Sequence, residues 1–94
     1  MLFSVRLVSR QPHNVGPEAW QEVTAEQLRA IKELFDQSKI KAIYRETGVG
    51  VLGIFDVPDA REMDQTIAGM PMARYFADVE VHPLWDMSVV LRSQ

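Results

Sequence analysis

Three glycines in the middle of the chain have the spacing most often associated with cofactor chemistry. Gly48, Gly50 and Gly53 spell G-x-G-x-x-G. In a dinucleotide-binding turn this pattern precedes a helix, whose N-terminus holds the pyrophosphate. Here it leads into the strand-like run 54–57, and no helix can begin before Pro58. We therefore interpret the motif as a tight turn between two strands, with two glycines inside the second strand, and we predict no cofactor.

Polar side chains interrupt the apolar face of the predicted helix 18–37. Thr24 and Gln27 fall on the face formed by Trp20, Val23, Ile31, Leu34 and Phe35, with Leu28 on its margin. A buried polar group that finds no partner costs about 1–3 kcal/mol. Gln27 therefore either bonds a backbone group in the core or lines a pocket between helix and sheet. Glu26 is predicted to point outward.

Other candidate residues carry charge or could bind a metal. Arg45 is either a surface cation or an anchor for an anionic group. His13 lies in a predicted loop, and His82 has no metal-type spacing to it. The chain contains no cysteine, which excludes disulfides and thiol catalysis. No metal site is predicted.

The elements that must position these residues form one α+β domain spanning residues 1–94. Periodicity and turn residues predict strands at 2–8, 40–47, 49–57 and 75–83, and helices at 18–37 and from Pro58-Asp59 to Gly69. The order β-α-β-β-α-β is that of a ferredoxin-like unit with an antiparallel sheet.

The third predicted strand is apolar on both faces. Val51 and Phe55 point to one side, and Leu52 and Ile54 to the other. A small antiparallel sheet with one covered face should instead alternate apolar with polar residues. We therefore expect a second subunit to close a barrel across a homodimer or larger homo-oligomer. The apolar C-terminal tail, residues 84–94, is expected to dock on a neighbouring subunit.

Composition limits the partners further. The net charge is −3 with no basic cluster, so nucleic acid is not an expected partner. No apolar run approaches the roughly 20 residues of a membrane span. The N-terminus carries Arg6 too early for a signal peptide. We expect a cytoplasmic protein.

Four short segments together resemble the muconolactone delta-isomerase family. They are Met1-Leu2-Phe3, Gly53-Ile54-Phe55-Asp56-Val57, Met70-Pro71 and Val79-Glu80-Val81. The resemblance covers nearly the whole chain and implies a dimeric α+β barrel. It also implies a cofactor-independent isomerase, or related lactone enzyme, that acts on a small carboxylated ring compound in aromatic catabolism.

The resemblance further implies which residues bind the substrate. Arg45 and Tyr44 match an arginine and an aromatic residue of the family. Arg6 stands where the family has a lysine, Ser4 where it has a histidine, and Gln27 where it has a glutamate that serves as a base. The complete predicted set is Arg45, Tyr44, Gln27, Thr24, Trp20, Arg6 and Ser4. An amide cannot accept a proton at neutral pH, and Glu26 lies about 100° away on the helix, so no catalytic base is identified.

Two classes of function follow. The first is the isomerase or lactone enzyme described above. The second is a non-catalytic member of the fold that binds a small molecule or serves in assembly, which the amide at Gln27 favours. Cofactor-free oxygenase chemistry is a third and weaker alternative.

Overall fold

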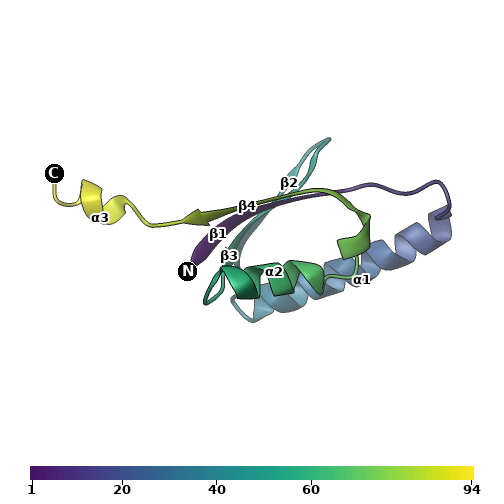
Figure 1. The fold of residues 1–94 in the computed structure, drawn as a ribbon, viewed down its shortest axis with the longest axis horizontal. Helices are drawn as coiled ribbons and strands as arrows, with labels where there is room; N and C mark the ends of the chain where they lie inside the picture. Colours follow the sequence, from purple (N-terminus) through teal and green to yellow (C-terminus); the bar gives the residue numbers. More distant parts are fainter.

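The computed structural model describes all residues from Met1 to Gln94 as two layers, a four-stranded antiparallel sheet and two helices that cover one of its faces (Figure 1). The strand order is β2-β3-β1-β4. The elements are β1 (Leu2–Ser9), α1 (Pro17–Asp36), β2 (Ile40–Glu46), β3 (Gly50–Asp56), α2 (Ala60–Ala68), the single 3₁₀ turn η1 (Ala73–Tyr75), β4 (Phe76–Leu84) and α3 (Ser88–Leu91). The predicted ferredoxin-like unit is confirmed, and each predicted boundary lies within about one residue of the observed one.

The two central strands direct alternate side chains to opposite faces of the sheet. In β1, Val5 pairs with Gly53 and Val81 on the face that the helices cover. Its neighbour Arg6 pairs with Leu52 and Glu80 on the other face. We call these the covered face and the open face. The prediction that β3 is apolar on both sides is confirmed, because Phe55 is buried on the covered face while Ile54 lies on the open face.

The core lies between the covered face and the helices. Its buried cluster consists of Phe3, Val5, Leu7, Ile40, Phe55, Val57, Met63, Ile67 and Met70, with Ile31 and Leu34 of α1 packed against it. Leu28 and Phe35 remain mostly exposed. They are seven residues apart and so form one stripe of α1, at the margin of the arc that faces the sheet. The prediction that Phe35 belongs to the buried face was wrong for this reason.

The glycine motif serves the turn and the packing of the hairpin. Gly48 adopts a φ of +79° in the turn between β2 and β3. A Cβ on Gly50 would lie 2.3 Å from the carbonyl oxygen of Leu7, so only a glycine fits beside β1 at that point. The motif opens no helix, as interpreted from the sequence.

Local capping fixes the second helix. Asp59 is the N-cap of α2, and its carboxylate accepts a hydrogen bond of 2.8 Å from the Glu62 amide. The helix ends at Gly69, before Pro71. In the segment after Gly69, the side chains of Met70 and Met72 are buried.

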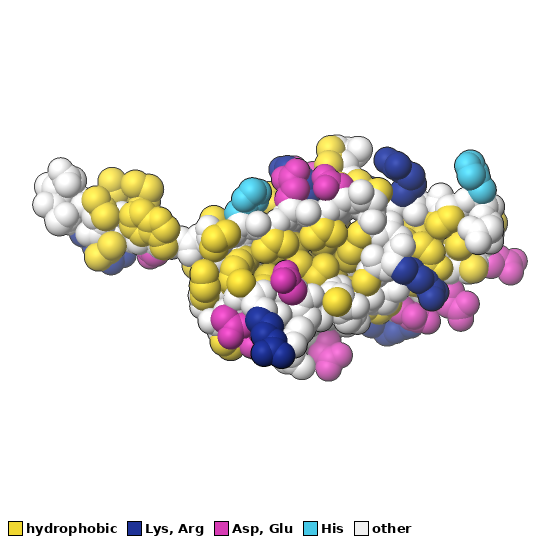
Figure 2. Space-filling model, viewed as in Figure 1, with side chains coloured by type: hydrophobic (Ala, Val, Ile, Leu, Met, Phe, Trp, Pro, Cys, Tyr) yellow, Lys and Arg dark blue, Asp and Glu magenta, His cyan; other side chains and the backbone are white.

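The C-terminal tail, residues 85–94, extends away from the two-layer body, with α3 near its end (Figure 1). Its apolar side chains form a separate cluster on the surface (Figure 2). They are Trp85, Met87, Val89, Val90 and Leu91, all exposed, and the Trp85 side chain has 71% of its surface accessible. Ser88 lowers the pKa of the Asp86 carboxyl below its ordinary value, first through its side-chain hydroxyl and then through its amide, which donates to Asp86 at 2.9 Å. None of the helices has the length and apolar character needed to cross a bilayer.

Candidate functional site

A cavity of about 340 Å³ lies between α1 and the covered face of the sheet. We call it the helix–sheet pocket. Its wall is mostly apolar, and it is formed by Leu7, Ser9, Gln27, Leu28, Ile31, Ile43, Tyr44, Arg45, Val51, Met72 and Phe76. Leu7, Gln27 and Met72 are buried and form its inner end, whereas Tyr44 and Arg45 are exposed and form its outer end. A mostly apolar cavity of this size with a few polar groups is typical of a small-molecule site.

Gln27 is the polar residue at the inner end, with only 8% of its surface exposed. Its Oε1 accepts a hydrogen bond of 3.1 Å from the Met72 amide, and its Nε2 donates to the Met70 sulfur at 3.4 Å. Both sequence interpretations hold at once. Gln27 bonds a backbone group of the core, and the same side chain lines a pocket.

Arg45 brings a positive charge to the outer end of the pocket. It pairs with Val51 across the hairpin and so shares the covered face of the sheet. The structure shows no hydrogen bond or ion pair for its guanidinium, which leaves that group free for an anion. Tyr44 pairs with Leu52, and the alternation of β2 turns its ring toward the open face, so Tyr44 borders the pocket at the edge strand.

Arg6 lies on the open face and is fully engaged by two carboxylates. Its Nε donates to Glu46 at 2.6 Å and its Nη1 donates to Glu80 at 3.0 Å. The hydrogen bond to Glu46, the charge of Glu46 and the charge of Glu80 raise the pKa of the guanidinium further. Ser4 and His82 border the same shallow hollow. The sheet therefore separates Arg6 and Ser4 from Gln27 and Arg45.

The remaining two predicted residues lie further along α1, toward its N-terminus. The Thr24 hydroxyl donates to the Trp20 carbonyl at 2.7 Å, which satisfies it within the helix. The Trp20 ring packs edge-on against Tyr75, with ring centroids 5.4 Å apart. Neither residue lines the helix–sheet pocket. Of the seven predicted residues, the structure thus places Gln27 and Arg45 on the same pocket, and Tyr44 borders that pocket although its ring turns toward the open face.

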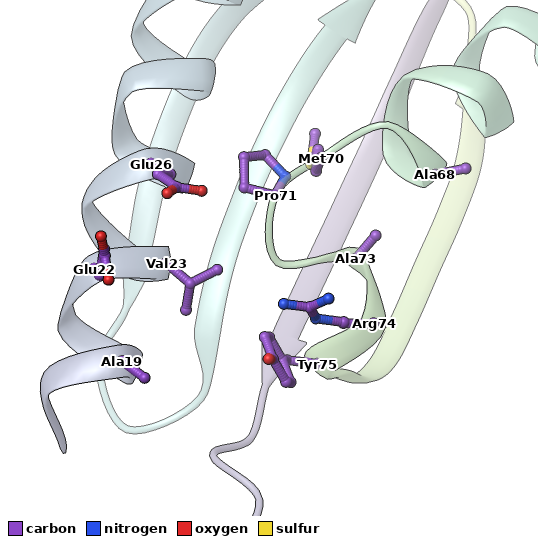
Figure 3. A pocket seen from close by; sticks show the side chains of 10 residues that line it. All are labelled: Ala19, Glu22, Val23, Glu26, Ala68, Met70, Pro71, Ala73, Arg74 and Tyr75. Atoms are coloured by element: carbon purple, nitrogen blue, oxygen red, sulfur yellow. The ribbon is translucent and has the colours of Figure 1, made fainter. Parts of the chain in front are cut away.

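A second hollow, of about 470 Å³, lies between the N-terminal half of α1 and residues 68–75. We call it the outer groove. Figure 3 shows Val23 and Glu26 of α1 facing Pro71 and Arg74 across this outer groove. Glu26 is exposed, as predicted, and it also borders the groove. The Arg74 guanidinium lies 4.9 Å from the Tyr75 ring centre. The Glu22 and Glu26 carboxylates line this open groove and are exposed to solvent.

Sequence reasoning missed several residues of the pocket wall. Phe76 enters the wall because a register shift between Val8 and Ser9 pairs Ser9 with Phe76. Met72 enters because the turn after Gly69 places its amide opposite Gln27. Periodicity carries no signal for a bulge or for a side chain that bonds a distant turn. The structure contains no group of three or more His, Cys, Asp or Glu side chains placed to hold a metal ion.

Comparison with known proteins places this geometry in context. A family model described as muconolactone delta-isomerase matches residues 1–88. The crystal structure of a muconolactone isomerase is similar, with a TM-score of 0.83, 24% identity, and coverage of 92% of this chain and 90% of that one. The 5-chloro-2-hydroxyhydroquinone dehydrochlorinase of Burkholderia phenoliruptrix AC1100, in complex with 2,5-dihydroxybenzoquinone, is similar with a TM-score of 0.71 and 20% identity, covering 90% of this chain and 94% of that one. No curated protein matches the sequence.

Proposed function

The chain belongs to the muconolactone delta-isomerase family, and we propose that it is a cofactor-independent isomerase, or a related lactone enzyme. Its substrate would be a small carboxylated ring compound of aromatic catabolism. The helix–sheet pocket would be the site of the reaction, and the protein would act in the cytoplasm.

The observation that carries this proposal is the free guanidinium of Arg45 beside an apolar cavity. A carboxylate binds an unpaired arginine strongly, because its two oxygens match the guanidinium donors. The apolar wall between Arg45 and Gln27 suits a ring that holds few polar groups. The structure of the similar dehydrochlorinase is a complex with 2,5-dihydroxybenzoquinone, another small ring compound, and a ligand of that size is compatible with a cavity of about 340 Å³.

Arg45 then has a defined part in a double-bond shift. Arg45 holds the carboxylate and fixes the ring. A base removes a proton next to the carbonyl and returns it further along the ring, while hydrogen-bond donors stabilise the enolate that forms between the two steps. The Gln27 amide cannot serve as this base, and the inner end of the pocket contains no carboxylate. We therefore leave the base unassigned.

The absence of a carboxylate at position 27 favours the second candidate function, in which the pocket binds a carboxylated ring compound without transforming it. The same Arg45 and the same apolar wall support this alternative. The two functions differ only in whether a proton is exchanged.

We also propose that the protein is a homodimer or larger homo-oligomer. The open face presents Leu52 and Ile54 next to the paired Arg6, and the tail exposes five large apolar side chains. Apolar surface of this kind is usually covered by a partner. A second copy would close a barrel over the open face, and the tail would dock on a neighbouring subunit.

The decisive experiment follows ring protons by NMR while the protein is incubated with muconolactone in deuterated water, alongside a Gln27→Glu variant. Deuterium uptake catalysed by the natural protein supports the enzyme and shows that a base other than residue 27 acts. Uptake with the variant alone supports a binding protein whose pocket is intact. If neither protein catalyses uptake and neither binds the lactone, the proposed substrate class is wrong.

A further inference from the structure

Building on the proposed function, we infer that Gln27 is a specificity-determining hydrogen-bond donor, whose side-chain amide recognises a ring carbonyl oxygen at the inner end of the helix–sheet pocket. The ligand would thus carry two groups, a carboxylate at Arg45 and a neutral carbonyl oxygen at Gln27. This assigns to the amide a role that a glutamate in the same place could not perform in its ionised form.

The orientation of the amide is fixed by the Met72 backbone. The Met72 N–H needs an acceptor, and it lies 3.1 Å from Oε1 of Gln27. An amide turned the other way would place its own hydrogens against that N–H. Hence Oε1 must face Met72, and Nε2 must lie on the other side of the side chain.

The donor side of the amide is left only partly satisfied. Nε2 carries two hydrogens, and its one acceptor in the protein is the Met70 sulfur at 3.4 Å. A thioether sulfur is a weak acceptor and can take one of the two hydrogens. The second hydrogen therefore has no protein acceptor, and Gln27 lines the helix–sheet pocket. A ligand carbonyl oxygen would accept this hydrogen and form a stronger hydrogen bond than the thioether sulfur can.

The apolar wall around Gln27 favours a neutral ligand oxygen over a charged one. Because Leu7, Ile31, Met72 and Phe76 contribute to the wall around the inner end, the environment is one in which a full negative charge would be expensive to bury. A neutral carbonyl oxygen avoids that cost and still accepts a hydrogen bond. The anionic group stays at the exposed end, where Arg45 and solvent both stabilise it.

The test compares two probe ligands that differ only in a ring carbonyl, 4-oxocyclohexanecarboxylate and cyclohexanecarboxylate, by calorimetric titration. We expect the natural protein to bind the ketone about tenfold more tightly than the compound that lacks it, as one neutral hydrogen bond of about 1.4 kcal/mol implies. On binding of the ketone, the NMR signal of one Gln27 side-chain amide hydrogen should move downfield. A residue with a merely structural role would not give this shift.

Three variants separate the contributions. Gln27→Met keeps an unbranched side chain of similar length but has no donor, so the preference for the ketone should disappear. Gln27→Glu, studied at pH 8, keeps an acceptor for the Met72 amide if the first variant fails to fold, and its carboxylate should disfavour the ketone. Thr24→Val removes a hydroxyl on the same helix outside the pocket and should leave the tenfold ratio unchanged.

The outcomes distinguish this inference from the proposed function. If the natural protein binds both probes equally and Arg45→Met weakens both, the carboxylate site stands and the role of Gln27 is overturned. If Gln27→Met is folded and keeps the tenfold preference, the inference is likewise overturned. If neither probe binds to the natural protein, the proposed site and this inference both fall.

Discussion

The two faces of the sheet each present an arginine from a strand, and the two arginines differ in what holds them. Arg6 on the open face donates to Glu46 and Glu80. Arg45 on the covered face has no carboxylate partner and borders an apolar cavity. A guanidinium that already bears two carboxylates has little left to offer a ligand, whereas an unpaired one beside a cavity is available. Charge alone therefore does not identify a binding residue, and its partners must be known.

Substitutions on the two faces of the sheet should differ most in how much they lower the stability of the fold. Phe55→Ala removes a ring that is 1% exposed in the core of the covered face, and we expect it to lower the free energy of unfolding by about 3–5 kcal/mol. Its neighbour Ile54 points to the open face. Ile54→Ala should cost much less in the monomer and should instead weaken self-association. Urea unfolding and sedimentation velocity measure the two effects, and equal losses of monomer stability would contradict the distinction between the faces.

A second contrast concerns the binding of anions. Arg45→Met should weaken the binding of a ring carboxylate about ten- to hundredfold, because a charge-assisted hydrogen bond of about 1.5–3 kcal/mol is lost. Arg6→Met is the matched control and should leave the dissociation constant unchanged, since Arg6 lies across the sheet from the pocket. Calorimetry with cyclohexanecarboxylate provides the measurement. The comparison of the arginines would fail if Arg6→Met weakened binding as much as Arg45→Met.

The smallest expected effect is that of the ion pairs on the open face. Arg6→Met should lower the melting temperature slightly, and the loss should shrink as salt is added, because the Arg6 side chain is 36% exposed and is screened by ions. The double variant with Glu46→Gln should add little further loss, because both changes break the same contact. Thermal unfolding at low and high salt tests both statements, and strict additivity would show that the pair does not act as a unit.

Periodicity and turn chemistry were enough to predict the layers of the fold. The alternation around Ile54 and Phe55 gave the two faces of β3, and Asp59 with Gly69 gave the limits of α2. These features are local, so a few neighbouring residues encode them. The one clear error, at Phe35, arose because the width of the contacted arc depends on the sheet opposite and not on the helix itself.

The candidate site was predictable only in part. Gln27 was identifiable because a polar residue interrupts an apolar stripe, and Arg45 because a strand cation lies beside apolar residues. The partners of Gln27 lie more than 40 positions away, at Met70 and Met72. The two carboxylates that occupy Arg6 lie 40 and 74 positions away in sequence. Contacts of that range are set by the tertiary fold, which is why Arg6 and Arg45 were indistinguishable before the structure placed them on opposite faces.

The strand order has a consequence for how the molecule is made. β1 precedes the other strands in the sequence, yet it occupies the interior of the sheet between β3 and β4. Its pairing runs to Leu84, so the sheet cannot be completed until β4 has been synthesised. Pairings of such long range slow folding, because the chain must close large loops before any contact stabilises them. Until then, the apolar strand Leu2–Ser9 has two unpaired edges, and synthesis is the period in which aggregation is the greatest hazard.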